Sequence, residues 1–554
     1  MNPAKSTSSI NEPLSPTSEQ PQLEQAPTGV SAGRDVTLYH NNNSPFFDLP
    51  ELTQLKIIRF LGLREITRLA KVCRYFRDLV NQDRALERAW YRRFPSPQQY
   101  QLRSTIETKD QQQLRDWLEP FADKGTIGLL MEQGKNIHFS VQLLFTNSKL
   151  MSLCKEFELV EKLEITHGGR VYQATLSPDG QHLATASRDT TAKIYSREPN
   201  GSWEEKAVIT HEYWVISATF SPDGRYLIIA AHRGTVKIYG LEDDGSWEEK
   251  ASISHETYIT SATFCADGRR VLTVGYGNDA LLKITGRGDN GSWELEDTLQ
   301  KNWITSAKLS PDGRHLIIHT PGYRVIEIQS QLAAGLWAVT STIQLEDGSD
   351  RVKFSADSCH LVISTFAPAA IIYELQADGS WKKMGTIKHD DLIQSANFSA
   401  DCLHLVTASK DNTAKIYSQS AGSWKEKACI VHSGGVRSAS FSADCQHVVT
   451  NSDDATAQIN SLQTDGSWAL KASIVHYDQV VSATFSADAC HVVTASDDGK
   501  VKIYGLEADG SWLQKAVIQK ETKFTAVSFS ADSRNVVTVS MDNKVRITEL
   551  RKKD

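Results

Sequence analysis

Cysteine is scarce in this sequence, and none of it is arranged as a metal or dithiol site. The eight cysteines lie at positions 73, 154, 265, 359, 402, 429, 445 and 490, and no two of them form a Cys-x-x-Cys pair. This spacing excludes a zinc ribbon and a thioredoxin-type site. We therefore expect reduced, partly buried thiols in a cytosolic protein.

The sequence also lacks an excess of positive charge, a long apolar segment and the motifs of common enzymes. Its 554 residues hold 60 Lys and Arg against 67 Asp and Glu, a net charge of −7. We expect no nucleic acid as a partner. No apolar run is long enough to span a membrane, and the N-terminus has no apolar core of a secretory signal. Without a Walker loop, a His-Glu-x-x-His motif or paired carboxylates, the sequence predicts no enzyme, no metal and no cofactor.

Three different regions precede the main part of the chain. Residues 1–45 are rich in Ser, Pro, Gln and Asn, so they predict a disordered tail. Residues 46–94 carry three series of apolar residues at helical spacing, which predict three short amphipathic helices. So small a core often needs a partner to cover its apolar face. Residues 95–156 predict a mostly helical linker.

Residues 157–554 repeat at a fixed period. A Ser-Pro-Asp or Ser-Ala-Asp motif, with Cys265 once in place of Ser, recurs nine times, and the Asp positions lie 43–45 residues apart. A Gly-Ser-Trp marker, changed to Gly-Leu-Trp at Trp337, recurs between these motifs. Each unit reads as four short strands joined by turns, the pattern of a β-propeller blade. The tryptophans that begin the outer strands are expected to be packing residues.

The two ends of the repeat predict how the ring closes. The chain stops after the third strand of the ninth unit, and an extra strand, 159–166, precedes the first unit. That extra strand would complete the last blade and leave no free edge. The fold class is therefore mainly β, a nine-unit propeller in one ring, with the helical regions before it.

Two segments resemble known families. The sequence LPELTQLKIIRFL, followed by REITRLAKVCRYFRDLV and LERAW, resembles an F-box, and TFSPDGRYL and TASRDTTAKIY resemble WD repeats. The order of the two is that of the F-box/WD-repeat substrate receptors of SCF-type cullin–RING ubiquitin ligases. Two departures, Tyr for the usual Trp at the end of the third strand and the added Gly-Ser-Trp, indicate a divergent lineage and leave open an effector that mimics host receptors.

The resemblance implies a function and its residues. The F-box would dock a Skp-family adaptor, and through it a cullin, while the propeller would present a protein or peptide substrate, phosphorylated or not, for ubiquitination. The positions that match the F-box, and so the expected adaptor contacts, are Leu49, Pro50, Leu52, Ile58, Leu61, Val72, Cys73 and Phe76. The expected place of action is the cytoplasm, or the host cytosol for a delivered effector, with the nucleus left open.

Repeated His, Ser and Asp residues raise the alternative of a nucleophilic enzyme. His167 precedes Asp189 by 22 residues, with Ser187 two residues before the Asp, and three other units repeat this spacing. An enzyme needs one such site rather than four. We interpret the set as a structural hydrogen-bond network that ties strands together, as in WD-repeat blades.

The predicted substrate site lies on the loops that enter the first strand and join the second strand to the third. These loops carry aromatic and Arg residues on blades one to four, the composition of an interaction hot spot. The predicted residues are Arg170, Arg188, Trp214, Arg233, Tyr258 and Trp303. Aromatics packed between blades are the alternative. For the whole chain, the alternatives are an interaction scaffold or effector unrelated to ubiquitin and, with less support, a propeller enzyme.

Overall fold

A computed structural model describes residues 51–72, 74–82, 84–134, 138–198, 200–276, 280–301, 304, 306–319, 324–331, 337–420 and 422–553. The predicted tail, 1–45, lies outside these residues. The chain divides into two compact units, Met1–Phe60 and Leu61–Asp554. The first unit contributes one described helix, α1 (Glu51–Phe60), and the second holds all other helices and strands.

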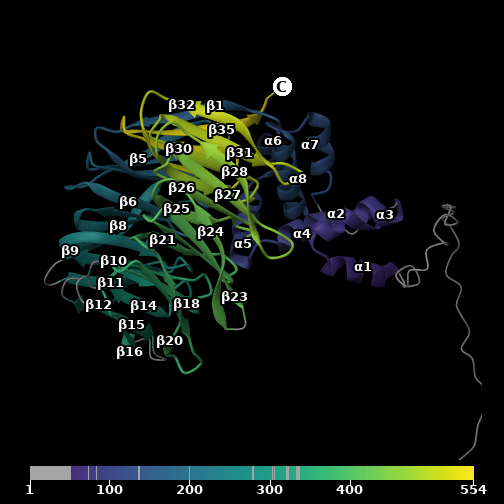
Figure 1. The fold of residues 1–554 in the computed structure, drawn as a ribbon. Coiled ribbons are helices and arrows are strands. Elements are labelled where there is room, and N and C mark those ends of the chain that lie inside the picture. The colour runs from purple at the N-terminus through teal and green to yellow at the C-terminus, as the bar shows by residue number, and fades with distance from the viewer. Residues whose placement is uncertain are drawn as a thin grey trace, which may run out of the picture. The chain divides into compact units, whose positions relative to one another are not determined.

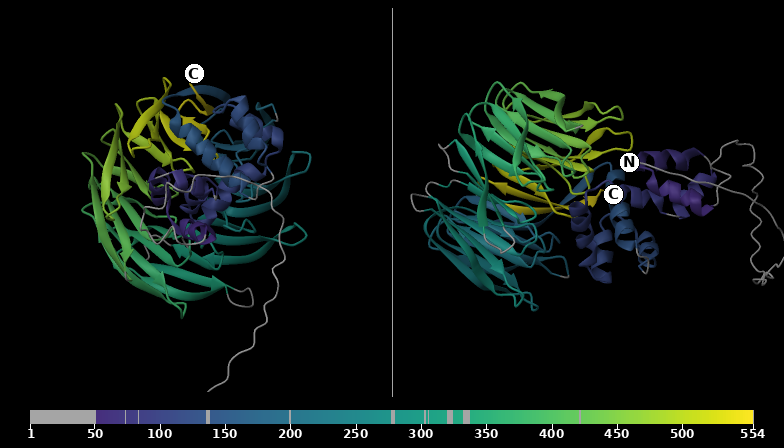
Figure 2. Two further views of the ribbon diagram at one scale, coloured as in Figure 1. Left: turned by 90° about the vertical axis from the view of Figure 1, so that its right-hand side faces the viewer. Right: turned by 90° about the horizontal axis from the view of Figure 1, so that it is seen from below.

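The second unit is dominated by antiparallel strands that form nine blades in a ring (Figures 1 and 2). From the inner to the outer strand, blade 1 has β2 (Val171–Leu176), β3 (His182–Ser187), β4 (Thr191–Arg197) and β5 (Trp203–Thr210). Blades 2 and 3 share one seven-stranded sheet with β6 (Val215–Phe220), β7 (Tyr226–Ala231), β8 (Arg233–Leu241), β9 (Trp247–Phe264), β10 (Arg270–Tyr276), β11 (Ala280–Arg287) and β12 (Trp293–Lys301). The long β9 is the outer strand of blade 2 and the inner strand of blade 3.

The remaining blades are separate four-stranded sheets. Blade 4 has β13 (Ser306–Leu309), β14 (His315–His319), β15 (Val325–Gln331) and β16 (Trp337–Gln344); blade 5 has β17 (Ser349–Phe354), β18 (His360–Thr365), β19 (Ala369–Leu375) and β20 (Trp381–Lys388). Blade 6 has β21 (Ile393–Phe398), β22 (His404–Ser409), β23 (Thr413–Ser420) and β24 (Ser423–Val431); blade 7 has β25 (Val436–Phe441), β26 (His447–Ser452), β27 (Thr456–Leu462) and β28 (Trp468–Val475). Blade 8 has β29 (Val480–Phe485), β30 (His491–Ser496), β31 (Lys500–Leu506) and β32 (Trp512–Gln519); blade 9 has β33 (Phe524–Phe529), β34 (Asn535–Ser540) and β35 (Lys544–Lys552).

The ninth blade is completed by the first strand of the repeat region, β1 (Phe157–Thr166). It pairs antiparallel with β35 along nearly its whole length, from Phe157 opposite Lys552 to Thr166 opposite Lys544. Apolar residues also join blade 9 to blade 1, because Ile165 and Val545 share one buried cluster with Val171. The predicted closure of a nine-blade ring is confirmed, although rings of four to eight blades are more typical.

The repeated sequence markers are the turns and packing residues of each blade. In blade 1 the Ser177 hydroxyl donates to the Asp179 carboxylate at 2.5 Å and accepts from the His182 N–H at 2.9 Å, which holds the turn between the first two strands. The Gly-Ser-Trp tryptophans pack between blades: the Trp247 ring lies 5.7 Å from Phe220 and 5.4 Å from His182 of the preceding blade. The side of the ring with these turns is called the turn face, and the opposite side the loop face.

Four helices occupy residues 51–92 rather than the three predicted. After α1, the second predicted helix is divided into α2 (Leu63–Val72) and α3 (Arg74–Gln82), and α4 (Ala85–Arg92) follows. Apolar periodicity alone does not reveal this division, because the apolar series continues from one helix into the next. The linker forms α5 (Ser96–Glu107), α6 (Gln111–Leu118), α7 (Lys124–Met131) and α8 (Phe139–Leu153).

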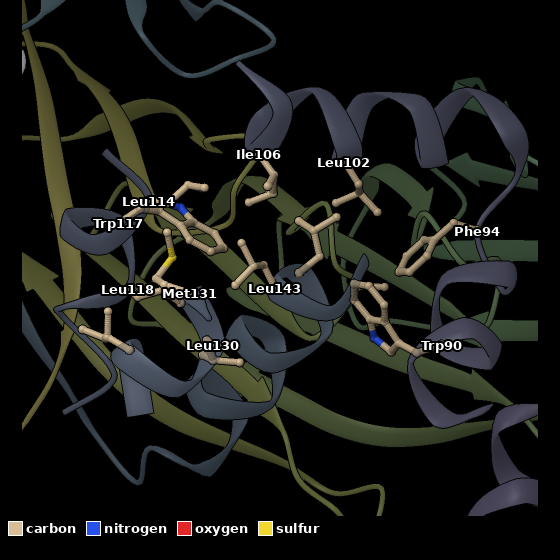
Figure 3. Packing of buried hydrophobic residues seen from close by; sticks show 13 residues of the cluster. Trp90, Phe94, Leu102, Ile106, Leu114, Trp117, Leu118, Leu130, Met131 and Leu143 are labelled. Carbon is tan, nitrogen blue, oxygen red and sulfur yellow. The ribbon is translucent and has the colours of Figure 1, made fainter. Parts of the chain in front are cut away.

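The start of α6 is set locally by a capping box. Asp110 accepts from the Gln113 N–H at 2.8 Å, and the Gln113 side chain accepts from the Asp110 N–H at 2.9 Å. Apolar residues of α4 to α8, including Trp90, Leu102, Leu118 and Leu143, form one buried cluster (Figure 3). Ala489 of blade 8 belongs to the same cluster, so these helices pack directly on the propeller.

Polar contacts fix the same helices to the turn face of blades 7 to 9. The Arg93 guanidinium lies 3.3 Å from the Asp444 carboxylate of blade 7 and donates to the Asp488 carbonyl of blade 8 at 2.8 Å. The Trp117 indole N–H donates to the Asp532 carboxylate of blade 9 at 3.1 Å. The helical layer is therefore an integral part of the propeller unit rather than a loose connector.

Candidate protein-interaction site

The loop face of blades 1, 6, 7 and 8 is held by a repeated buried network. In blade 1, His167 Nδ1 lies 2.9 Å from the Asp189 carboxylate, and Nε2 lies 2.8 Å from the Thr185 hydroxyl. The other three copies join His389 to Asp411 at 2.7 Å, His432 to Asp454 at 3.0 Å and His476 to Asp498 at 3.2 Å. Burial lowers the pKa of all four histidines.

The serine of each set does not bond to the histidine. The Ser187 hydroxyl, fully buried, donates to the Gly169 carbonyl at 3.1 Å and accepts from the Asp189 N–H at 3.1 Å. Burial opposes ionisation of Asp189, but hydrogen bonds from Thr191 and His167 outweigh it and lower its pKa to about 2. The network therefore fixes the loop before the inner strand, and we call the His–Asp–Thr hydrogen-bond set the latch. Its geometry lacks the Ser–His bond of a nucleophilic triad.

Blade 2 has lost this latch and is built differently. Arg233 stands where the Asp would be, 22 residues after His211, and the buried Nε2 of His211 has no hydrogen-bond partner among the described residues. The strands extend instead: β8 begins at Arg233, which pairs with Tyr258 in the continuous strand β9. A β-ladder thus stands in place of the loop, and this ladder holds the side chains of β8 and β9 at fixed positions on the loop face.

Three exposed aromatic rings, the half-buried imidazole of His232 and two exposed Arg side chains form a connected row across blades 1 to 3, which we call the platform. The Arg188 guanidinium lies 4.3 Å from the Trp214 ring, and Trp214 stacks on His232 with centroids 5.6 Å apart. His232 lies 4.9 Å from Tyr258, and the Arg233 guanidinium lies 5.7 Å from Tyr258 and 5.8 Å from Tyr213. The platform comprises Arg188, Tyr213, Trp214, His232, Arg233 and Tyr258.

The backbone holds the platform in place, and the rings remain accessible. His232 N–H donates to the Trp214 carbonyl at 2.7 Å, and Ile259 N–H donates to the His232 carbonyl at 3.0 Å. Trp214 is 40% and Tyr258 49% exposed, so these two aromatics do not pack between blades. Among the described side chains, neither Arg188 nor Arg233 forms an ion pair within 4.0 Å, which leaves both free to meet an acidic group.

The structure brings together four of the six predicted substrate-site residues. Arg188, Trp214, Arg233 and Tyr258 belong to the platform, and exposed Arg170 lies beside it because its carbonyl accepts from the Arg188 N–H at 2.8 Å. Trp303 lies outside the described residues. Tyr213 and His232 are not among the six predicted residues, although His232 lies on the same predicted loop as Arg233 and Tyr213 directly precedes Trp214.

The predicted adaptor-binding residues differ in how exposed their side chains are. Phe76 is buried, Ile58 is buried and Leu61 is half-buried, so these side chains are not exposed contacts as they stand. Val72 is 67% exposed and is, among the predicted residues whose side chains the structure describes, the one open to a partner. The positions outside that part of the structure are Leu49, Pro50 and Cys73, together with the side chain of Leu52.

Among the helices of the described residues, none has the length and apolar composition of a membrane span. No group of three or more His, Cys, Asp or Glu side chains in the same part of the chain could hold a metal ion.

Comparison with protein families identifies both regions. The F-box-like family matches residues 46–93, and the WD domain, G-beta repeat family matches 158–196, 203–240, 381–418, 424–460, 468–505 and 515–548. The unmatched stretch, residues 241–380, includes blades 3 and 4 and the first three strands of blade 5. This combination is that of F-box/WD-repeat proteins, whose families are generally non-catalytic modules for protein–protein interaction.

Solved structures resemble the chain at low sequence identity. The C-terminal WD40 domain of Sif2 is 16% identical with a TM-score of 0.48, and the similarity covers 72% of this chain and 99% of that one. Sqt1 of Saccharomyces cerevisiae is 11% identical with a TM-score of 0.46, and the similarity covers 71% and 98%. No protein with a curated description matches the sequence.

Proposed function

We propose that this chain, which combines an F-box-like domain with WD40 repeats, is a substrate-recognition adaptor of an SCF-type ubiquitin ligase. The F-box-like helices dock a Skp-family adaptor, which links the chain to a cullin, and the platform binds a protein or peptide substrate. Other subunits then supply the chemistry. The contribution of this chain is proximity and orientation of the substrate.

The exposed platform is the observation that carries this proposal. Exposed Trp, Tyr and Arg side chains, held by a β-ladder, have the composition and the rigidity of an interaction hot spot. Arg93 directly follows α4 and is bonded to blades 7 and 8. These bonds tie the helices of residues 61–92 to the propeller that would hold the substrate.

Exposed apolar side chains in the F-box-like segment support the docking role. Val72 of α2 is 67% exposed, and in α1 Phe60 is 90% and Ile57 38% exposed. Exposed apolar side chains of this kind are what a protein partner covers. The free cysteines among the described residues are consistent with action in the cytosol or nucleus.

Adaptor docking is tested by co-precipitation of the full chain with a Skp-family adaptor. Leu49→Ala with Pro50→Ala should weaken binding by about 1,000-fold and Val72→Asp by about 30-fold, because each anchor of this kind contributes about 2 kcal/mol or more. A platform variant, Trp214→Ala with Tyr258→Ala, is the matched control and should bind the adaptor normally. Unchanged binding of the double variant, or no binding by the wild type, contradicts the proposal.

Substrate recognition is tested by the same platform variant in affinity capture followed by mass spectrometry. Proteins held by the wild-type chain should be released by Trp214→Ala with Tyr258→Ala, whereas Tyr477→Ala should retain them. Tyr477 is 86% exposed and lies outside the platform, so it controls for loss of any exposed ring. Retention by the platform variant at normal thermal stability would reject this surface.

A further inference from the structure

The innermost strands of the propeller are tied to one another by polar side chains. The Thr175 hydroxyl of blade 1 donates to the Ala218 carbonyl of blade 2 at 2.5 Å, and Asn397 of blade 6 donates to the Ala439 carbonyl of blade 7 at 2.7 Å. In the sheet register, these positions are the next-to-last residues of each inner strand. One residue of every blade therefore contributes to a row around the inside of the ring.

This inner row is neutral except in two adjacent blades. Its members, from blade 1 to blade 9, are Thr175, Thr219, Thr263, Lys308, Lys353, Asn397, Ser440, Thr484 and Ser528. Seven are hydroxyl or amide side chains, which suit hydrogen bonding between strands. The two lysines stand side by side in blades 4 and 5, and Arg351 lies two residues before Lys353 on the same strand.

The two lysines occupy equivalent positions on the inner strands of neighbouring blades, and both reach solvent. Lys308 is exposed, and Lys353 is half-buried and donates to the Asn397 side-chain oxygen at 2.6 Å. Burial, followed by the charges of Lys308 and Arg351, lowers the pKa of Lys353. Among the described side chains, neither lysine forms an ion pair within 4.0 Å.

Such an arrangement costs stability unless a negative group joins it. Like charges held together destabilise a fold, and a multivalent anion would relieve the repulsion while accepting hydrogen bonds from nearby hydroxyls. Phosphate groups suit the site because their oxygens accept from both ammonium and hydroxyl donors. A Lys is a point charge that can bind one phosphate oxygen without the fixed geometry that Arg requires.

We propose that the inner row at blades 4 and 5, centred on Lys308 and Lys353, is a binding site for a small phosphate-bearing anion. The site lies on the inner strands, separate from the platform, and does not depend on the ubiquitin role proposed above. Its ligand is a free polyanion whose negative charge offsets the positive charge of the two lysines. Pyrophosphate is the inorganic test ligand and inositol hexakisphosphate the organic one.

The experiment measures binding of these two anions to the full chain by calorimetry, with thermal melting at constant ionic strength. The test variant is Lys308→Thr with Lys353→Asn, which installs residues that other blades carry at the same position. It should bind at least tenfold more weakly than the wild type, and without anion it should melt at a higher temperature because the repulsion is gone. Each single variant provides a milder test if the double variant folds poorly.

The matched control removes the same charge from the outer rim. Lys425→Thr with Lys427→Asn changes two exposed residues of β24 and should bind within twofold of the wild type. Binding of either anion that depends on the inner lysines supports the proposal, and the anion that binds more tightly identifies the source. Wild-type chain that binds neither anion at millimolar concentration, or a double variant that binds as tightly as the wild type, overturns it.

Discussion

The contact between Trp117 and blade 9 should contribute a measurable part of the free energy of unfolding of the unit Leu61–Asp554. Trp117 is 3% exposed in α6, its indole N–H donates to the Asp532 carboxylate at 3.1 Å, and the Arg534 guanidinium lies 4.1 Å from its ring. Burial works against ionisation of Asp532, but the positive charge of Lys109 helps to lower its pKa, so the acceptor is charged.

Replacing Trp117 with Phe keeps an aromatic ring and removes the hydrogen bond. A bond to a charged acceptor contributes about 1.5–3 kcal/mol, and the smaller ring adds a packing loss. Trp512 supplies a matched control: it is 4% exposed, and its indole N–H has no hydrogen-bond partner among the described residues. Trp512→Phe therefore suffers the packing loss alone, and the two variants should differ by about 1.5–3 kcal/mol.

The assay is urea unfolding of both variants and the wild type, with hydrogen exchange to locate the loss. Trp117→Phe should lower the free energy of unfolding more than Trp512→Phe, and protection should fall first in α6 to α8. Equal losses in the two variants would refute the view that the indole–carboxylate bond anchors the helical layer.

The histidines and the latch give two further predictions. Burial first, then nearby lysines, lowers the pKa of His211 and His255 to about 4, below the value of 6.5 for the unfolded chain. The unfolded state therefore takes up protons first as the pH falls. Urea titrations should show that the free energy of unfolding decreases from pH 6.5 to 4, by at most ~1.4 kcal/mol per pH unit for each histidine. A flat profile in this range would contradict the lowered pKa of these two histidines. Asp411→Asn, which weakens the bond to His389, should cost about 1.5–3 kcal/mol, against under about 0.5 kcal/mol for the exposed turn residue Asp378→Asn; equal costs would show that the latch adds no stability.

The repeat architecture was predictable because it depends on local, repeated signals. The spacing of the Ser-x-Asp turns and the alternation of apolar residues determine four strands per unit, and the extra strand before the first unit predicts its pairing with β35. The His–Asp latch was predictable for the same reason, since four copies at one spacing indicate a structural role.

The candidate site was predictable in composition and not in geometry. Aligning the repeats selected Trp214 and Tyr258, and the neighbouring loop supplied Arg188, because equivalent positions of a propeller lie on one face. The continuous strand β9, which joins blades 2 and 3 and places Tyr258 opposite Arg233, depends on pairing between distant segments. Nothing in the local sequence shows that the lost latch is replaced by a ladder.

The sequence by itself determined the ring, its closure and the absence of a charge pattern typical of nucleic-acid binding, because periodicity and composition are local properties. Only the tertiary structure decided which apolar residues of α1 to α3 are exposed, that the linker packs on the turn face through Arg93 and Trp117, and that two lysines occupy equivalent positions on the inner strands of adjacent blades. Burial and charge proximity arise when residues far apart in the sequence pack together, and no single segment contains that information.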